Sequence, residues 1–544
     1  MKKSVIKGLL LGAILMSVTS CKDLEEINID PNNPTEVSTP AILLGAEKKT
    51  MDYLYDTWFS GRQSLLYAQY WAQRNYTEED RYQIRESVNN SYFNQFYVTA
   101  GNLVKIEQLN TDEATKATMS AYGNNNNQIA VAKIFKVWLI QTMADTWGAI
   151  PYSESFKLDE GIYYPKYDDL NTLYNSLISE LDNAISLINV NETAFTTGDN
   201  IYSGDAAKWK KFGNSLKCRL AIRISKVDGN WKNYIEEAIA SGVFDSNADN
   251  ALFTYSTSAP NQCYFYKGFF DDARNDFSVS KPLVDLLQGQ ADVLNEKSHP
   301  WPNVVDPRLQ IYANSNSEGN YIGIPYGVAS EDLSRITPGI SQTPDFMAGR
   351  PLVVQANFAV PLMTYPEICF ILSEYKGFAV DEYKKGVQAS LEYWNSQSAR
   401  VMSSAPITND AITAYVNAVS NTVNAETLAT QKYIHLYMNG TEAWAEYRRT
   451  GYPNCLLKPG EKSTVANIID DKGNVTGTEI LIFEALSDTK GDLPARVKYP
   501  TNESTLNSKG FNDAVAKLSD GTNNYYSKMF WDVRTTATPH PANK

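Results

Sequence analysis

The sequence predicts a mostly α-helical protein, in which one large helical body carries a loop-rich insertion and a few short strands. Apolar residues recur at three- and four-residue steps on both sides of the middle of the chain, as in amphipathic helices. Residues 251–360 instead carry many Gly, Pro, Asn and aromatic residues and show little helical period. No Pro/Ser/Gly-rich linker divides the chain, so residues 41–544 are expected to form a single domain.

Four helical segments are expected before the insertion. Residues 41–73 follow the helical spacing, and residues 128–147 carry two apolar stripes, which predicts a helix buried on two sides. Residues 167–190 and 206–225 are amphipathic. Asp205 is placed to cap the last of these helices, because its carboxylate can accept the free amides of the first turn.

Helical spacing returns after the insertion, at residues 365–380, 382–398, 409–418 and 426–449. Successive helical hairpins of this kind would suit a solenoid-like stack. Within the insertion, the apolar run 251–255 is predicted to be a strand. After Thr450 the chain is expected to be irregular to its end.

The N-terminus has the order of a bacterial lipoprotein signal. Three lysines precede an apolar run, residues 9–16, that is too short to span a bilayer, and small residues then lead to Cys21. We expect a signal peptide at residues 1–20, acylation of Cys21, and a lipidated spacer at residues 21–40. Three acyl chains should hold the protein firmly at a membrane. The alternative is an ordinary signal peptide followed by an incidental cysteine.

The charge of the chain restricts its partners. The net charge is -13, and it becomes -16 when the three lysines of residues 1–20 are removed. This acidity argues against nucleic acid and against an anionic lipid surface as partners. Membrane contact is therefore expected through the lipid on Cys21 alone.

Metal, cofactor and catalytic chemistry have little support in the sequence. The chain has three histidines, and its cysteines lack metal-ligand spacing, so neither a metal site nor a cofactor is expected. No nucleophile elbow, phosphate-binding glycine loop or His-Glu-x-x-His motif is present, which predicts a protein that is not an enzyme. Four cysteines are expected to be buried free thiols, with one disulfide as the alternative: Cys218, Cys263, Cys369 and Cys455.

The strongest local pattern lies at residues 442–453. Two glutamates one helical turn apart precede Arg448 and Arg449, and Gly451 and Pro453 then end the helix. The arginines could clamp an anionic ligand, or carboxylate–guanidinium pairs could hold the end of the helix in place. The structural interpretation is favoured.

Aromatic residues are the main indication of a ligand site. The chain has 34 Tyr and 10 Trp, which combine an apolar face with a polar tip and suit stacking on sugar rings. Two clusters, around residues 71–93 and 261–274, lie in stretches without helical period, and core packing is the alternative role for them. The predicted ligand-binding residues are Trp71, Arg81, Tyr82, Asn261, Gln262, Tyr264, Tyr266, Phe269, Phe270 and Arg274.

Short motifs also follow one another in a specific order. They are Cys21, Ile-Asp-Pro-Asn at 29–32, Gln-Tyr-Trp-Ala at 69–72, Asp-Thr-Trp-Gly at 145–148, Lys-Trp-Lys-Lys-Phe at 208–212, Asp-Pro-Arg-Leu at 306–309, Met-Thr-Tyr-Pro-Glu at 363–367, Glu-Ala-Trp at 442–444, Arg-Arg-Thr-Gly-Tyr-Pro at 448–453 and Arg-Val-Lys-Tyr-Pro at 496–500. Together they resemble the SusD/RagB family of nutrient-binding outer-membrane lipoproteins of Bacteroidetes-type bacteria, in its SusD-like branch.

The resemblance implies tetratricopeptide-like helical pairs as a scaffold and a loop-rich part that carries the ligand site. It also implies an exterior location on the outer membrane and a SusC-like, TonB-dependent outer-membrane barrel as partner, on which the lipoprotein sits as a lid. The implied activity is capture without chemistry, followed by hand-over for import. An oligosaccharide is the favoured cargo. A peptide cargo and a surface glycoside hydrolase are the alternatives.

Overall fold

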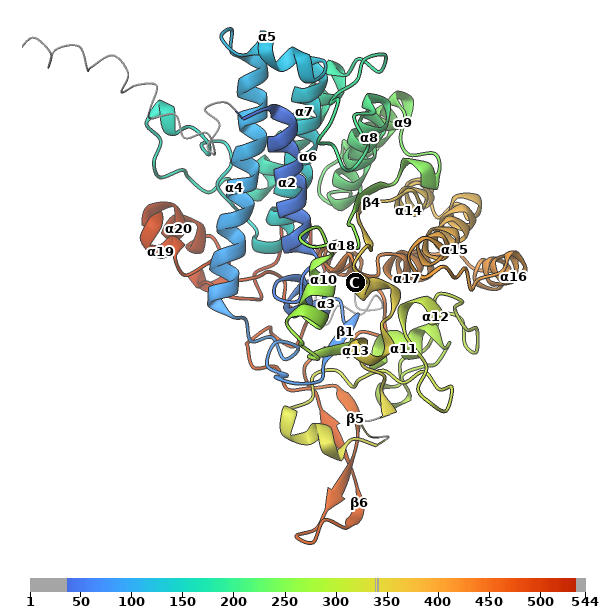
Figure 1. Ribbon diagram of the computed structural model, residues 1–544. Coiled ribbons are helices and arrows are strands. Elements are labelled where there is room, and N and C mark those ends of the chain that lie inside the picture. The colour runs from blue at the N-terminus through green and yellow to red at the C-terminus, as the bar shows by residue number, and fades with distance from the viewer. Residues whose placement is uncertain (1–36, 338, 340–341, 535–544) are drawn as a thin grey trace, which may run out of the picture.

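The computed structural model describes residues 37–337, 339 and 342–534. The predicted signal peptide, Cys21 and most of the predicted spacer lie outside the described residues. The hairpin at residues 462–482 and several loops lie at one end of the helical body, whereas the strand at residues 359–363 lies among the helices (Figure 1).

The helices before the insertion are α2 (Thr39–Leu54), α3 (Ser64–Tyr67), α4 (Glu86–Thr111), α5 (Lys116–Met119), α6 (Asn125–Trp147), α7 (Leu170–Leu187), α8 (Ala206–Arg223) and α9 (Trp231–Ser241). Within the insertion are α10 (Tyr264–Tyr266), α11 (Lys281–Leu287), α12 (Leu309–Tyr312) and α13 (Phe346–Gly349). Those after it are α14 (Tyr365–Tyr375), α15 (Val380–Met402), α16 (Asn409–Val419), α17 (Ala425–His435), α18 (Gly440–Thr450), α19 (Glu503–Leu506) and α20 (Ser508–Val515).

Successive helices pack against one another as hairpins. Before the insertion, each helix contacts the next one in the series α2, α4, α6, α7, α8 and α9. After the insertion, α14 contacts α15, α15 contacts α16, and α17 contacts α18. α14 also packs on α8 and joins the two halves. Most buried apolar side chains, from Leu43 to Trp531, form one continuous cluster, and Val328, Leu333 and Ile336 form a second, smaller one. The predicted mostly α-helical fold with tetratricopeptide-like helical pairs is confirmed.

The predictions for two helices hold in detail. In α6, 20 of the 23 residues are buried, as expected for a helix with two apolar stripes. The side chain of Asp205 accepts hydrogen bonds from the backbone N–H groups of Ala207 and Lys208 at the start of α8. The predicted N-cap is therefore present.

Two predicted helices are wrong in part, because each is divided into shorter helices. In the segment 41–73, α2 ends at Leu54 and the short helix α3 follows. Gln69, with a left-handed φ of 53°, then precedes the strand that begins at Trp71. The segment 426–449 divides into α17 and α18, and Met438 between them has a φ of 73°. A non-glycine residue in this region of φ cannot continue a right-handed helix.

α4 lies where the sequence pattern indicates an irregular stretch. Between Glu86 and Lys105 this helix has no charged residue, and it is rich in Asn and Ser, so its polar side is poorly marked. Contacts with α2 and α6 bury Phe96, Ala100 and Leu103 on its inner side. Tertiary packing therefore stabilises a helix that sequence spacing does not indicate.

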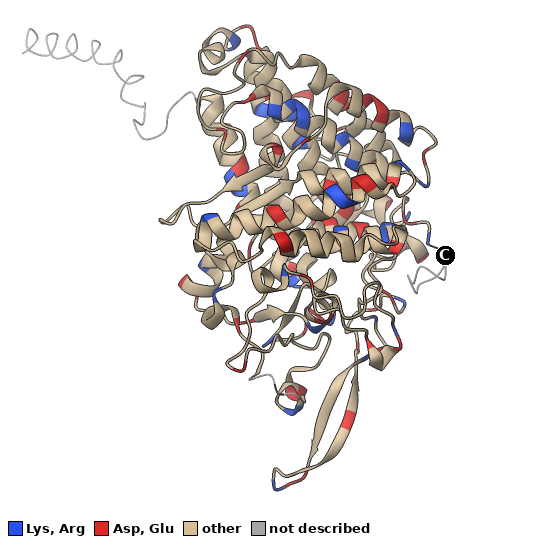
Figure 2. Ribbon diagram, turned by 90° about the vertical axis from the view of Figure 1, so that its right-hand side faces the viewer, with Lys and Arg blue, Asp and Glu red and all other residues tan. Residues whose placement is uncertain are grey.

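Three antiparallel two-stranded sheets complete the fold of the described residues. β1 (Trp71–Gln73) pairs with β3 (Phe277–Val279), and β2 (Ala251–Thr254) pairs with β4 (Ala359–Met363), which confirms the predicted strand at 251–255. β5 (Lys462–Ile469) and β6 (Val475–Ile482) form a hairpin that projects from the body (Figures 1 and 2). This hairpin and the helices α19 and α20 contradict the expectation of an irregular C-terminal part. The carboxylate of Asp470 closes the hairpin turn by accepting the N–H groups of Lys472 and Asn474.

None of the helices between residues 37 and 534 combines the length and the hydropathy needed to cross a bilayer. The four cysteines after Cys21 are free thiols. Cys218, Cys263 and Cys369 are buried, and Cys455 is partly buried.

Candidate functional site

A loop-rich face is formed by the turn after α2, the loop that precedes α4, and residues 264–276. The last segment contains α10 and a π-helical turn at Lys267–Asp271. Backbone N–H of Arg74 donates to the carbonyl of Asp276 at 2.6 Å, and the Asn75 amide donates to the carbonyl of Asn275 at 3.0 Å. These bonds hold the second and third segments side by side.

Asp56 sets the position of Trp58 on this face. Its Oδ1 accepts the N–H groups of Trp58 at 3.1 Å and of Phe59 at 2.7 Å, which turns the chain after α2. Its Oδ2 accepts the hydroxyl of Tyr92. Burial raises the pKa of Asp56 to about 7, although these hydrogen bonds favour the carboxylate. The Trp58 side chain remains partly exposed.

Three guanidinium groups surround the Trp58 ring. The Cζ atoms of Arg62, Arg274 and Arg85 lie 4.4, 5.1 and 5.8 Å from its centroid. Arg62 is buried and pairs with Asp276 at 2.6 Å. The side chains of Arg85 and Arg274 are 42% and 29% exposed, so both can donate to a ligand that touches the ring.

Further rings lie on α10 and the π-helical turn. The Tyr266 and Phe270 rings are 5.0 Å apart, and Cζ of Arg350 is 4.5 Å from the Phe270 centroid. Both rings are partly exposed. Gly268 packs against Thr57, where an added Cβ would approach the Thr57 side chain to 2.5 Å, so the turn can lie beside Trp58 only with glycine at this position.

Three of the predicted ligand residues are enclosed. Trp71, Tyr82 and Phe269 are each 0% exposed. The Trp71 ring lies 6.0 Å from that of Phe269 and 4.9 Å from that of Phe346, and the Tyr82 ring lies 5.4 Å from that of Phe483. These three residues pack in the core and present no surface to a ligand, as the core-packing alternative anticipates.

The other predicted residues reach the surface. Arg274 lies against Trp58, and Tyr266 and Phe270 lie on the partly exposed segment whose Gly268 packs against Thr57. Ligand contact remains a prediction for them and for the more peripheral residues, which are Arg81, Asn261, Gln262 and Tyr264. Arg81 donates to the carbonyl of Thr77, Gln262 donates to that of Thr257, and Asn261 is exposed.

Sequence reasoning missed Trp58, Arg85 and Arg350. Trp58 falls within a predicted helix, and no local pattern marks its ring as accessible. Arg62 is four residues away from Trp58, but the two accessible arginines at the Trp58 ring, Arg85 and Arg274, come from other parts of the chain.

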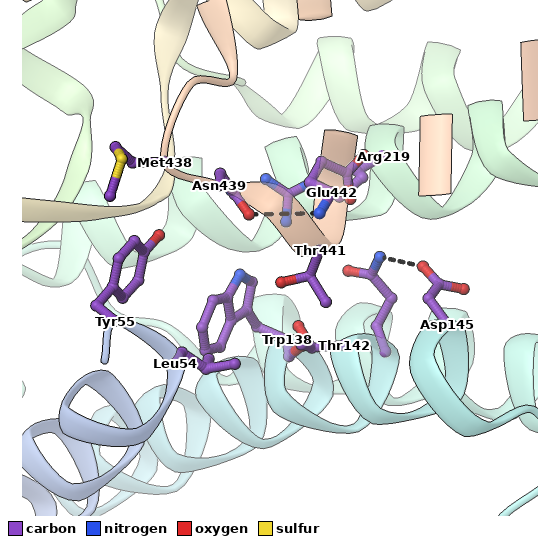
Figure 3. Close-up of a pocket in the computed structure, with 11 residues that line it drawn as sticks. Leu54, Tyr55, Trp138, Thr142, Asp145, Arg219, Met438, Asn439, Thr441 and Glu442 are labelled. Atoms are coloured by element: carbon purple, nitrogen blue, oxygen red, sulfur yellow. Dashed lines mark hydrogen bonds and ion pairs between the residues drawn. The ribbon is translucent and has the colours of Figure 1, made fainter. Parts of the chain in front are cut away.

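A second polar region is closed. The inner ends of α2, α6, α8 and α18 enclose a cavity of about 20 Å³, lined by residues that include Tyr55, Gln141, Arg219 and Glu442 (Figure 3). A space of this size holds about one water molecule. It cannot be the site of an oligosaccharide or a peptide.

Buried ion pairs surround this cavity. Arg219 binds Glu367 at 2.6 Å, and Arg223 binds Glu442 at 2.6 Å and Glu446 at 2.5 Å. Burial opposes the ionisation of Glu446, but the cations around it, Arg449 first among them, hold its pKa well below the usual range. Glu446 is therefore an ionised partner of arginines, and the ion pairs of Glu367 and Glu442 are enclosed in the same region.

The arginines at the end of α18 belong to the same buried region. Arg449 pairs with Glu374 at 2.7 Å, and Arg448 donates to the carbonyl of Ala495 at 2.9 Å. Each arginine is 1% exposed, so an anionic ligand cannot reach it. Gly451 ends the helix with a φ of 81°. The structural interpretation of this motif is therefore correct.

Over the described part of the chain, no group of three or more His, Cys, Asp or Glu side chains is arranged to hold a metal ion.

Comparisons with known proteins agree on one family. A family model described as "Starch-binding associating with outer membrane", SusD-like_2, matches residues 31–471. A solved structure of a chitin-binding protein is 26% identical, with a TM-score of 0.70, and covers 91% of this chain and 100% of its own. A search of curated proteins finds no match.

Two further structures show the same fold. A SusD homolog from Parabacteroides distasonis is 22% identical with a TM-score of 0.68, and covers 91% of this chain and 97% of its own. A SusD homolog from Bacteroides uniformis is 24% identical with a TM-score of 0.67, and covers 91% of this chain and 100% of its own.

Proposed function

The chain belongs to this SusD-like family, and on that premise we propose that it captures an oligosaccharide without chemistry and delivers it to a SusC-like, TonB-dependent outer-membrane barrel. The observation that carries the proposal is the setting of Trp58. Its partly exposed indole lies against Arg85 and Arg274, and the π-helical turn that carries Phe270 packs through Gly268 against the neighbouring Thr57.

This arrangement suits a sugar chain for two reasons. Aromatic rings offer flat apolar surfaces on which the C–H faces of sugars stack. Guanidinium groups offer several N–H donors in a fixed plane, which suit hydroxyl oxygens at the edge of the sugar ring. The similarity to a chitin-binding protein also favours a carbohydrate as cargo.

The location forms part of the proposal. Acylated Cys21 would hold the protein at the exterior face of the outer membrane, and residues 21–40 would connect the lipid to the helical body. Residues 41–544 would act as one domain, with the ligand region centred on residues 251–360 and extended by the turn at Trp58.

Isothermal titration tests the proposal. We expect heat of binding with neutral oligosaccharides and an affinity about tenfold lower in Trp58→Ala, which corresponds to about 1.4 kcal/mol. Trp231→Ala is the matched control. Trp231 is also partly exposed, but it packs against Tyr375 at 6.1 Å, far from this face, so its loss should leave the affinity unchanged.

Three outcomes would contradict parts of the proposal. Binding of peptides with no heat from any oligosaccharide would favour the peptide alternative. Release of shorter products after long incubation with a polysaccharide would indicate a surface glycoside hydrolase. Failure to co-purify with any outer-membrane barrel would remove the proposed partner.

A further inference from the structure

A groove of about 500 Å³ runs between α4, the 151–165 loop and α19. Figure 1 shows α19 on the side of α4 that is away from α2. The volume of the groove falls within the usual range of small-molecule sites. It is far larger than the volume of the closed cavity between α2, α6, α8 and α18. The groove contains none of the residues that surround Trp58.

Exposed apolar side chains are concentrated at this groove. In the described part of the chain, nine large apolar side chains are more than half exposed, and four of them line the groove: Val98, Leu158, Tyr163 and Leu506. The Tyr97 and Phe156 rings lie 6.2 Å apart in its wall. An exposed patch of this kind on a soluble body marks a binding surface.

Polar atoms without partners point to the kind of ligand. Asn507 is 6% exposed, and its amide nitrogen donates to the carbonyl of Pro165 at 2.7 Å. Its Oδ1 and the hydroxyl of Ser155 are buried and have no hydrogen-bond partner among the described residues. Unpaired buried polar atoms are costly, and a hydroxylated ligand would supply the missing bonds after small side-chain movements.

The charged residues of the groove are largely engaged. Glu154 pairs with Lys166, and Glu503 accepts the hydroxyl of Tyr167 at 2.7 Å. Lys157 is the remaining charged residue that lines the groove. The ligand that fits is therefore uncharged and combines apolar faces with hydroxyl groups, as a neutral sugar does.

α4 connects the groove to the Trp58 face. Ser87, Ser91, Asn94 and Val98 are exposed and spaced at steps of four, three and four residues, so they form one uncharged stripe on the helix. Arg85, which touches Trp58, is nine residues before Asn94, or about 13 Å along the helix axis. A chain of several sugar rings can span such a distance.

We propose that the groove is a second saccharide site, which holds a further part of the same neutral sugar chain that binds at Trp58. The inference rests on the proposed function in its choice of ligand. Two sites on one rigid helix make the second contact intramolecular, so long chains should bind much more tightly than short ones.

Titration with neutral oligosaccharides of increasing length tests this proposal. A short oligosaccharide should bind at two sites per wild-type molecule and at one site in Tyr163→Ala. The longest oligosaccharide should lose at least tenfold in affinity in the same variant, because the second contact is gone. Tyr164→Ala is the matched control, since Tyr164 is 72% exposed on the same loop but does not line the groove.

The outcomes separate this proposal from the proposed function. If Trp58→Ala binds oligosaccharides like wild type while Tyr163→Ala loses one binding site, the result supports the groove as a saccharide site and contradicts the proposed site at Trp58. If Tyr163→Ala and Tyr164→Ala bind the longest oligosaccharide equally well, the groove is not a saccharide site. If Tyr163→Ala loses only co-purification with a barrel, the groove binds protein and the inference is overturned.

Discussion

Two regions of the molecule are built from the same kinds of side chain. One is the closed region between α2, α6, α8 and α18, and the other is the open face at Trp58. Both combine arginines, carboxylates and aromatic rings. In the closed region Arg223 is 0% exposed at its side chain and has acidic partners on two sides. At the open face the Arg85 side chain is 42% exposed and has Glu79 as its acidic partner. The buried Arg223 therefore serves as an ion-pair partner within the scaffold. The exposed Arg85 keeps N–H donors that a ligand can reach.

The buried carboxylates differ between the two regions in the same way. Asp145 in the closed region lies 3.5 Å from Arg223. Asp56, behind the open face, has no ion pair within the portion of the chain that the structure covers, and backbone N–H groups and the Tyr92 hydroxyl bind it instead. Stability should therefore depend on ion pairs in one region and on protonation in the other.

The largest expected effect comes from breaking the closed region. Arg223→Met should lower the free energy of unfolding by roughly 3–5 kcal/mol, because it leaves the buried carboxylates of Glu442 and Glu446 without this cation. Urea unfolding measures the change. Lys509→Met removes an exposed ion pair with Asp513 and should leave the midpoint unchanged. An unchanged midpoint in Arg223→Met would show that the region tolerates loss of its central charge.

A smaller effect should appear as a pH dependence at Asp56. The folded pKa of about 7 exceeds the unfolded value of about 3.9, so folding takes up a proton between these values. The contribution of Asp56 to stability is therefore fully present below about pH 4 and is lost as the pH rises through 7.

Asp56→Asn should remove this dependence. Between pH 5 and pH 8 the wild type should lose on the order of 2 kcal/mol more than the variant, as measured by urea unfolding across that range. Asp410→Asn changes an exposed carboxylate and should keep the wild-type slope. An identical slope in Asp56→Asn would show that Asp56 titrates as it does in the unfolded chain.

The smallest effect concerns a helix end at the surface. Asp205→Ala removes the acceptor of the Ala207 and Lys208 N–H groups and should cost about 1 kcal/mol. Asp205→Asn keeps an acceptor oxygen and should recover most of the loss in thermal unfolding. Equal stability of both variants would mean that water replaces the cap without cost.

Sequence reasoning succeeded where a property depends on neighbours along the chain. The period of α6, the cap at Asp205 and the stop at Gly451 are all local, and each is present. Sequence reasoning failed for α4, because its uncharged outer side cannot be told apart from its apolar inner side by charge. It also failed for the C-terminal hairpin, which no short-range pattern indicated.

Exposure of the aromatic rings could not be predicted in this way. Trp58 and Trp71 are 13 positions apart, and no local sequence pattern distinguishes them. In the structure, Phe269 and Phe346 enclose the Trp71 ring, whereas the Trp58 ring is partly exposed. The rings that cover Trp71 come from the insertion, roughly two hundred or more positions away, and Trp58 is flanked by Arg274 of the insertion as well as by Arg62 and Arg85. Local spacing contains no information on such contacts.

The sequence alone determined the family, the helical scaffold and several helix ends, because these depend on motif order, periodicity and capping chemistry within a few residues. Only the tertiary structure decided which rings and arginines are exposed and which are enclosed. Burial results from long-range packing. Arginine side chains are therefore structural ion-pair partners in one part of the protein and accessible hydrogen-bond donors in another. For this protein, that division separates Arg223 from Arg85.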